Sequence, residues 1–187
     1  MRIISGELKG KKLSEPLDKS TRPLKDMVRE SIFNILDHSN KVSAKIYKAK
    51  VLDLFSGTGS FGIECLSRGA AEVFFFENYY NSLKILKKNI SILKLENKSK
   101  VYNNSAYNLE DSNFKNMIFD IIFLDPPFKD VKIKSLIDQI KKIKITDKNS
   151  TLIIHRNKKS DDNIPQYLKI IEEKNYGLSK IFFCKLI

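Results

Sequence analysis

Four consecutive residues, Asp125, Pro126, Pro127 and Phe128, combine side chains that can do chemistry on a planar amine. They follow the mostly apolar run 119–124, which predicts a fully buried strand. Because proline lacks a backbone N–H and pushes the preceding residue into an extended conformation, the two prolines end this strand abruptly. A carboxylate, free carbonyl oxygens and an aromatic ring then lie together, where they can accept hydrogen bonds from an amino group and stack on its ring. The alternative is a strand-ending turn with Phe128 in the core.

A second group of residues that could bind a ligand begins at Asp53 and continues into a glycine-rich loop. Glycines let the backbone approach a ligand closely, and the N-terminus of the following helix offers unpaired N–H groups. Gly57, Gly59 and Gly62 match the dinucleotide-binding pattern GxGxxG, with Glu77 twenty residues after the first glycine. A nicotinamide-dependent enzyme is therefore one interpretation of this segment.

Two features favour a ligand without phosphates. Asp53 lies four residues before Gly57, where its carboxylate can accept a hydrogen bond from a cationic amino group, and the prolyl turn at Asp125 has no role in a nicotinamide site. Glu77 ends a predicted strand, and its two oxygens suit the two hydroxyls of a ribose. An adenosine with an amino-acid tail meets these requirements, which predicts S-adenosyl-L-methionine. The alternatives are helix capping for Asp53 and an exposed strand end for Glu77.

Strands and helices alternate over most of the chain, which indicates an α/β fold with a mostly parallel sheet. Apolar runs predict seven strands, at 51–55, 72–77, 100–103, 120–124, 151–155, 169–176 and 180–187. Helical spacing of apolar residues predicts four helices, at 25–37, 61–68, 79–93 and 132–143. Residues 2–13 predict a β-hairpin with Gly6 and Gly10 at its bends, and residues 38–49 a linker. Phe55 and Phe61 are expected to pack in the core.

The net charge of +12 over 187 residues points to a polyanionic partner, of which nucleic acid is the commonest. Residues 1–50 carry 12 basic and six acidic side chains, so this segment holds half of the excess charge. A compositional bias that scatters lysine over solvated faces is the alternative. Lys9, Lys11 and Lys12 of the predicted hairpin are candidates for RNA contact, or for protection of an edge strand.

The remaining composition indicates an intracellular protein. No apolar run approaches the roughly 20 residues that span a bilayer, and the first six residues lack the apolar core of a signal peptide. Cys65 and Cys184 have neither metal-ligand spacing nor a disulfide framework. We therefore expect a reducing cytoplasm, no metal and two buried thiols.

Read together, these motifs resemble one protein family. Asp-Leu-Phe-Ser-Gly-Thr-Gly-Ser at 53–60, Asp-Pro-Pro-Phe at 125–128, Arg-Ile-Ile-Ser-Gly at 2–6 and Arg-Pro-Leu-Lys-Asp-Met-Val-Arg-Glu-Ser-Ile-Phe-Asn-Ile-Leu at 22–36 are similar to the RsmD-type methyltransferases. These enzymes methylate the N2 amine of a guanine in 16S ribosomal RNA. The resemblance covers nearly the whole chain and implies a Rossmann-like class I methyltransferase fold. It implies an RNA-docking hairpin and helix extension at 1–40 and a methyltransferase domain at 41–187.

The resemblance also implies roles for particular residues. Asp125 and the Pro126 carbonyl would accept hydrogen bonds from the guanine amine, while Phe128 would stack on the base. Arg22, in the loop before the first helix, and Arg29, on the polar side of that helix, would join the hairpin lysines in contacting phosphates, or else would bond helix ends and neighbouring acids such as Glu30. The implied cofactor-binding residues are Asp53, Ser56, Gly57, Gly59, Glu77, Asn78, Ser105 and Ala106.

Three positions depart from the family pattern. Lys25 stands where the family usually has threonine, and Asn104 or Ser105 stands where an acidic or amide side chain contacts the adenine. His155 follows the fifth predicted strand where the family often has an acidic residue, so no role is assigned to it.

The expected partner is 16S ribosomal RNA or the assembling small ribosomal subunit, bound by a monomer away from any membrane. Two other functions remain open at this point. An adenine-N6 DNA methyltransferase also uses a prolyl turn with an aromatic residue, although 187 residues leave little room for a target-recognition domain. A catalytically silent RNA-binding module would bind ribosomal RNA without the cofactor.

Overall fold

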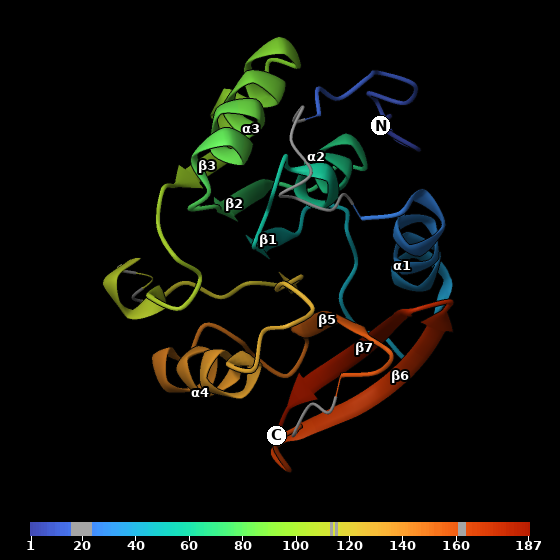
Figure 1. Ribbon diagram of the computed structural model, residues 1–187. Helices are drawn as coiled ribbons and strands as arrows, with labels where there is room; N and C mark the ends of the chain where they lie inside the picture. The colour runs from blue at the N-terminus through green and yellow to red at the C-terminus, as the bar shows by residue number, and fades with distance from the viewer. Residues whose placement is uncertain (16–23, 113, 115, 161–163) are drawn as a thin grey trace.

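The computed structural model describes residues 1–15, 24–112, 114, 116–160 and 164–187 (Figure 1). Its centre is a seven-stranded sheet with strand order β3-β2-β1-β4-β5-β7-β6. The strands are β1 (Lys50–Leu54), β2 (Glu72–Phe76), β3 (Ser99–Tyr102), β4 (Ile121–Leu124), β5 (Thr151–Asn157), β6 (Leu168–Tyr176) and β7 (Ser179–Leu186). The first five are parallel, whereas β7 pairs antiparallel with both β5 and β6. The predicted mostly parallel sheet of seven strands is confirmed.

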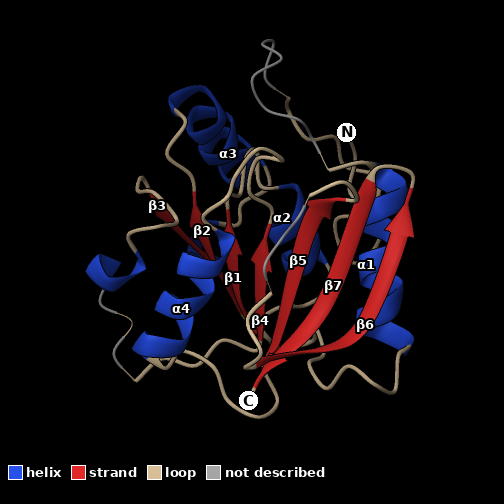
Figure 2. Cartoon of the chain, turned by 60° about the horizontal axis from the view of Figure 1, so that its bottom comes forward, coloured by secondary structure: helices blue, strands red, loops and turns tan. Residues whose placement is uncertain are grey.

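Helices cover both faces of this sheet (Figure 2). The helices are α1 (Asp26–His38), α2 (Ser60–Ser67), α3 (Tyr80–Ile92) and α4 (Ile133–Ile143), with short 3-10 helices at Glu96–Lys98 and Leu109–Ser112. One hydrophobic cluster joins α1, α2 and α3 to one face of the sheet, and a second joins α4 to the other face. In β1, Val51 belongs to the first cluster and Leu52 to the second, so successive strand residues are buried on opposite faces. This two-sided burial explains why the strands are continuous apolar runs in the sequence.

The N-terminal segment pairs over a shorter stretch than the predicted hairpin. Arg2 and Lys12 form an antiparallel bridge, the Ile3 and Leu13 N–H groups donate to the carbonyls of Lys11 and Met1, and turns occupy the chain between them. Ile3 and Leu13 are buried in the same hydrophobic cluster as α1 and α2. The segment is therefore a compact loop that packs on the sheet's helices, because its apolar side chains point inward instead of alternating along a ribbon. The predicted linker 38–49 likewise contributes buried side chains to that cluster.

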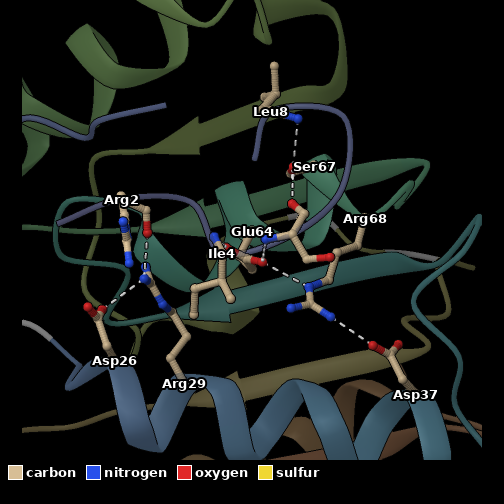
Figure 3. A network of polar contacts seen from close by, with 10 residues as sticks. Arg2, Ile4, Leu8, Asp26, Arg29, Asp37, Glu64, Ser67 and Arg68 are labelled. Atoms are coloured by element: carbon tan, nitrogen blue, oxygen red, sulfur yellow. Dashed lines mark hydrogen bonds and ion pairs between the residues drawn. The ribbon is translucent and has the colours of Figure 1, made fainter. Parts of the chain in front are cut away.

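Two buried charged side chains attach this loop to the helices (Figure 3). Glu64 of α2 accepts hydrogen bonds from the backbone N–H groups of Ile4 and Ser5 at 2.8 and 2.9 Å. Arg29 of α1 donates to the Arg2 carbonyl at 2.6 Å and to Asp26 at 2.9 Å. The bonds from Ile4 and Ser5 to Glu64 and from Arg29 to the Arg2 carbonyl join segments far apart in the chain, so they fix the loop against α1 and α2.

Arg29 corrects one expectation from the sequence. It was placed on the polar side of its helix and among the RNA contacts, but its side chain is fully buried. Burial lowers the pKa of the guanidinium, while the nearby Asp26 and Glu64 carboxylates oppose this shift. A guanidinium enclosed in this way cannot reach a phosphate, so its bonds to the Arg2 carbonyl and Asp26 define its role in the fold.

The two cysteines are buried, as predicted. Burial raises the pKa of the Cys184 thiol to about 12 and that of Cys65 well above its usual value. In the described part of the chain, no helix is both long enough and apolar enough to cross a membrane.

We predict that Glu64→Ala lowers the free energy of unfolding by roughly 2–4 kcal/mol, because two part-buried backbone N–H groups and Arg68 lose their buried acceptor. Urea denaturation followed by circular dichroism measures this loss. Glu30→Ala, which removes an exposed carboxylate from α1, is the matched control and should change stability by less than about 0.5 kcal/mol. Equal stability of the two variants would contradict the anchoring role of Glu64.

Candidate active site

A cavity of about 390 Å³ opens beyond the carboxyl ends of β1, β2, β4 and β5. Its volume lies in the range of small-molecule sites, and its position is the one at which open α/β sheets bind ligands. The turns that follow these strands supply most of the lining, and the start of α1 and the start of β7 supply the rest. The lining residues are Leu24, Lys25, Phe55, Gly57, Glu77, Asn78, Tyr79, Asp125, Pro126, Pro127, Phe128, His155 and Ser179.

The turn after β1 depends on left-handed backbone conformations. Gly57 has φ +57° and Gly59 has φ +87°, and Phe55 adopts φ +62° despite its side chain. A Cβ atom on Gly59 would lie 2.5 Å from Leu86, whereas one on Gly57 would meet nothing within 4 Å. The two glycines therefore serve different needs: Gly59 allows close packing on α3, and Gly57 presents bare backbone to the cavity. Phe55 packs against the core as expected and also lines the cavity.

Glu77 is held in place by this turn. Its Oε2 accepts a hydrogen bond from the Gly57 N–H at 2.7 Å, and its Oε1 accepts one from the Tyr79 N–H at 2.7 Å. Burial raises the pKa of the Glu77 carboxyl, opposed by bonds from the N–H groups of Tyr79, Gly57 and Asn78. With 8% of its surface exposed, Glu77 is not the exposed strand end that the alternative required. Each oxygen keeps a lone pair that can accept from a ligand hydroxyl.

Asp53 takes the helix-capping position. Its Oδ2 accepts a hydrogen bond from the Gly62 N–H in the first turn of α2 at 3.0 Å, and its side chain is almost fully buried. Burial raises the pKa of Asp53 well above its usual value, opposed by the Gly62 N–H and reinforced by the charges of Asp125 and Glu77. Asp53 does not belong to the cavity lining and shapes the glycine-rich turn from beneath.

The prolyl turn after β4 is held from β5. Asp125 Oδ1 lies 2.7 Å from Nδ1 of His155. Arg156 donates to the carbonyls of Pro127 at 3.3 Å and Asp130 at 2.6 Å. All four residues of the turn, Asp125, Pro126, Pro127 and Phe128, line the cavity.

His155 and Arg156 are the functional residues that sequence reasoning missed. The signal lies in strand pairing: β4 and β5 are parallel with Leu124 beside Ile154, so Asp125, the first residue after β4, is level with His155. His155 itself is still part of β5 and pairs with Ile181 of β7. A pairing register of this kind is absent from a single sequence.

Comparisons with known proteins show the family to which the chain belongs. The family model described as "Conserved hypothetical protein 95" matches residues 1–185. Ribosomal RNA small subunit methyltransferase D of Buchnera aphidicola (subsp. Acyrthosiphon pisum, strain APS) is 34% identical over 172 residues, 92% of this chain and 86% of that protein. The Haemophilus influenzae protein of the same name is 31% identical over 179 residues, 95% and 90% of the two chains. The chain belongs to the RsmD-type methyltransferase family.

Solved structures show the same fold. The structure described as "Putative methyltransferase yhhF" from Escherichia coli superimposes with a TM-score of 0.83 at 28% identity, covering 100% of this chain and 97% of that chain. The predicted class I methyltransferase fold is thereby confirmed for this RsmD-type chain.

Several residues that the RsmD resemblance assigned to the cofactor lie outside the cavity lining. Ser56 donates to the carbonyls of Asp53 and Phe76, and it is buried. Ser105 accepts from the Tyr107 N–H and Ala106 packs in the core. The structure therefore brings together Gly57, Glu77, Asn78, Asp125, Pro126 and Phe128 around one cavity, whereas Asp53, Ser56, Gly59, Ser105 and Ala106 lie behind or beside it.

The residues assigned to RNA contact do not all lie where the sequence predicted. Lys9, Lys11 and Lys12 are exposed on the N-terminal loop, as an RNA-docking surface requires. Arg22 lies outside the described residues. Lys25, which departs from the RsmD pattern, lines the cavity at the start of α1.

We predict that Asp53→Asn becomes more stable relative to the wild type as the pH rises from 5 to 8. The pKa of Asp53 is higher in the folded protein than in the unfolded chain, where it is 3.8. The contribution of Asp53 to the free energy of unfolding is therefore fully present below pH 3.8 and is lost as the pH rises through the raised pKa. Asparagine does not titrate, so the variant escapes this loss. Chemical denaturation at each pH measures the difference.

Asp138→Asn is the control for this titration. The pKa of Asp138 is lowered, chiefly by the Tyr167 hydroxyl, so its contribution changes only below its usual value of 3.8. The stability difference for this control should be flat between pH 5 and 8. If the stability difference between Asp53→Asn and the wild type were also flat over this range, the raised pKa of Asp53 would be contradicted.

Proposed function

We propose that this protein transfers a methyl group from S-adenosyl-L-methionine to the exocyclic N2 amine of a guanine in small-subunit (16S) ribosomal RNA. One observation carries the proposal: a single cavity is lined by the glycine turn and Glu77 on one side and by the Asp125–Phe128 turn on the other. The first half of the cavity, with the glycine turn and Glu77, suits an adenosine-bearing cofactor. The second half, with the Asp125–Phe128 turn, suits an amine. The names of the ribosomal RNA methyltransferase relatives support the choice of substrate.

The residues of the first half fit the proposed cofactor. Glu77 presents two oxygens, already aimed by the N–H groups of Gly57 and Tyr79, to the hydroxyls of a ribose. Gly57 has open space where a side chain would be, so the ligand can approach its backbone. Asn78, between Glu77 and Tyr79, completes this wall of the cavity. When bound, the cofactor supplies a methyl group on a positively charged sulfur, which is open to attack by a nucleophile.

The residues of the second half prepare the nucleophile. The guanine amine is a weak nucleophile because its lone pair is delocalised into the ring. The Asp125 carboxylate and the Pro126 carbonyl accept hydrogen bonds from the amine, which draws the nitrogen toward tetrahedral geometry and directs its lone pair at the methyl carbon. As the new C–N bond formed, the bond between the methyl carbon and the sulfur would break and leave S-adenosylhomocysteine, and the amine proton would pass to Asp125 or to water. Phe128 stacks on the base and contributes on the order of 1–3 kcal/mol.

The base reaches this cavity by leaving its stack, as substrates of base-modifying enzymes do. Lys9, Lys11 and Lys12 are placed to contact phosphates of the RNA and give an affinity that falls with salt. The substrate is 16S RNA or the assembling small subunit in the cytoplasm, and the protein acts as a monomer. An adenine-N6 methyltransferase is the second candidate, because the acceptors of the Asp125 turn also suit the adenine amine.

We predict that Asp125→Ala lowers methyl transfer to small-subunit RNA at least about 100-fold, because the amine loses its charged acceptor. The dissociation constant for S-adenosyl-L-methionine, measured by calorimetry, should change less than about threefold. Asp138→Ala, which removes an aspartate of α4 outside the cavity lining, is the matched control and should leave both quantities unchanged.

Two results would contradict the proposal. Near-normal turnover by Asp125→Ala would remove the role of this carboxylate. Absence of detectable cofactor binding by the wild type would instead favour a silent RNA-binding module.

A further inference from the structure

We propose that His155 is a positioning residue that holds the Asp125 carboxylate in its working orientation. The inference rests on the proposed methyl transfer and adds a residue to it. Parallel pairing of β4 with β5 places Leu124 beside Ile154, so Asp125, directly after β4, is level with His155, which β5 and its pairing with β7 hold in the sheet. Both side chains line the cavity. The contact is therefore built into the sheet and does not depend on a chance meeting of loops.

The contact engages one particular nitrogen of the ring. Nδ1 of His155 lies 2.7 Å from Asp125 Oδ1, and the histidine is 6% exposed. Nε2 is buried and has no hydrogen-bond partner among the described residues. Since a carboxylate oxygen accepts, Nδ1 carries the hydrogen and donates it. This contact uses one lone pair of Oδ1, and Oδ2 is the oxygen that we assign to the substrate amine.

The same ring contacts the aromatic wall of the site. The rings of Phe128 and His155 meet edge to face, with centroids 5.6 Å apart and an interplanar angle of 73°. Arg156, the residue that follows His155 in the chain, donates to the carbonyls of Pro127 and Asp130. Two consecutive residues of β5 thus hold the prolyl turn at its start and at its end, and His155 contacts the side chains of Asp125 and Phe128.

This arrangement acts on catalysis through orientation. An aspartate carboxylate rotates about its terminal torsion unless a partner fixes it. A hydrogen bond to Oδ1 fixes the plane of the carboxylate, and with it the position of Oδ2 relative to the attacking nitrogen. Small errors in such positions reduce turnover strongly while leaving the cofactor wall unaffected. His155 should therefore affect kcat and not the affinity for the cofactor.

A matched pair of variants tests this role. The amide nitrogen of asparagine takes the place of Nδ1 in a histidine, whereas that of glutamine takes the place of Nε2. We expect His155→Asn to keep kcat within about threefold of the wild type and His155→Gln to lower it roughly 10- to 100-fold. KM for S-adenosyl-L-methionine and the dissociation constant of S-adenosylhomocysteine should be unchanged in both. Thermal denaturation confirms that both variants fold.

Equal kcat values for the two variants would overturn the inference, and so would an equal loss of cofactor affinity in both. A second measurement does not depend on activity. The chain has two histidines, His38 and His155, so nitrogen-15 NMR can assign the tautomer of each ring. We expect a hydrogen on Nδ1 of His155, and a bare Nδ1 would overturn the proposal. An inactive wild type whose His155 Nδ1 carries a hydrogen would count against the methyltransferase function and leave the contact supported.

Discussion

The pairing register of three parallel strands is the constraint on which the whole site depends. Leu54 of β1 lies beside Phe76 of β2 and beside Leu124 of β4, so the chain leaves all three strands at one level. Helices cover both faces of the sheet, and a slip of one residue would move each buried side chain to the opposite face. Hydrophobic burial therefore places the next residues, including Glu77 and Asp125, at one edge before any polar contact forms.

Buried hydrogen bonds then give the turns their shapes. Glu77 accepts from the N–H groups of Gly57 and Tyr79, and Asp53 accepts from that of Gly62. Burial raises the pKa of both carboxyls, so each carries a desolvation cost that these N–H groups offset in part. The result is a glycine turn whose backbone faces the cavity on one side and whose conformation is held by two acids on the other. Rigid positioning of this kind is what methyl transfer between two bound molecules requires.

Long apolar runs and helical spacing predict the sheet and the helices because they leave few alternatives. The motifs predict six of the residues that line the cavity: Gly57, Glu77, Asn78, Asp125, Pro126 and Phe128. Burial of Arg29 was missed because its charge was taken to indicate a polar face. Its spacing, three residues before Ile32 and four before Phe33, already placed it on the buried stripe of α1. The contact between His155 and Asp125 was missed for another reason. Strands buried on both faces show no alternation, so a single sequence does not reveal which residues face each other across neighbouring strands.

The most direct test is to identify the nucleoside that receives the methyl group. Purified protein would be incubated with small-subunit RNA, or with partly assembled subunits, and S-adenosyl-L-methionine carrying an isotopically labelled methyl group. Digestion to nucleosides and mass spectrometry would then locate the label. The account predicts one labelled product, N2-methylguanosine. Label in N6-methyladenosine, or no labelled nucleoside from either substrate, would contradict it.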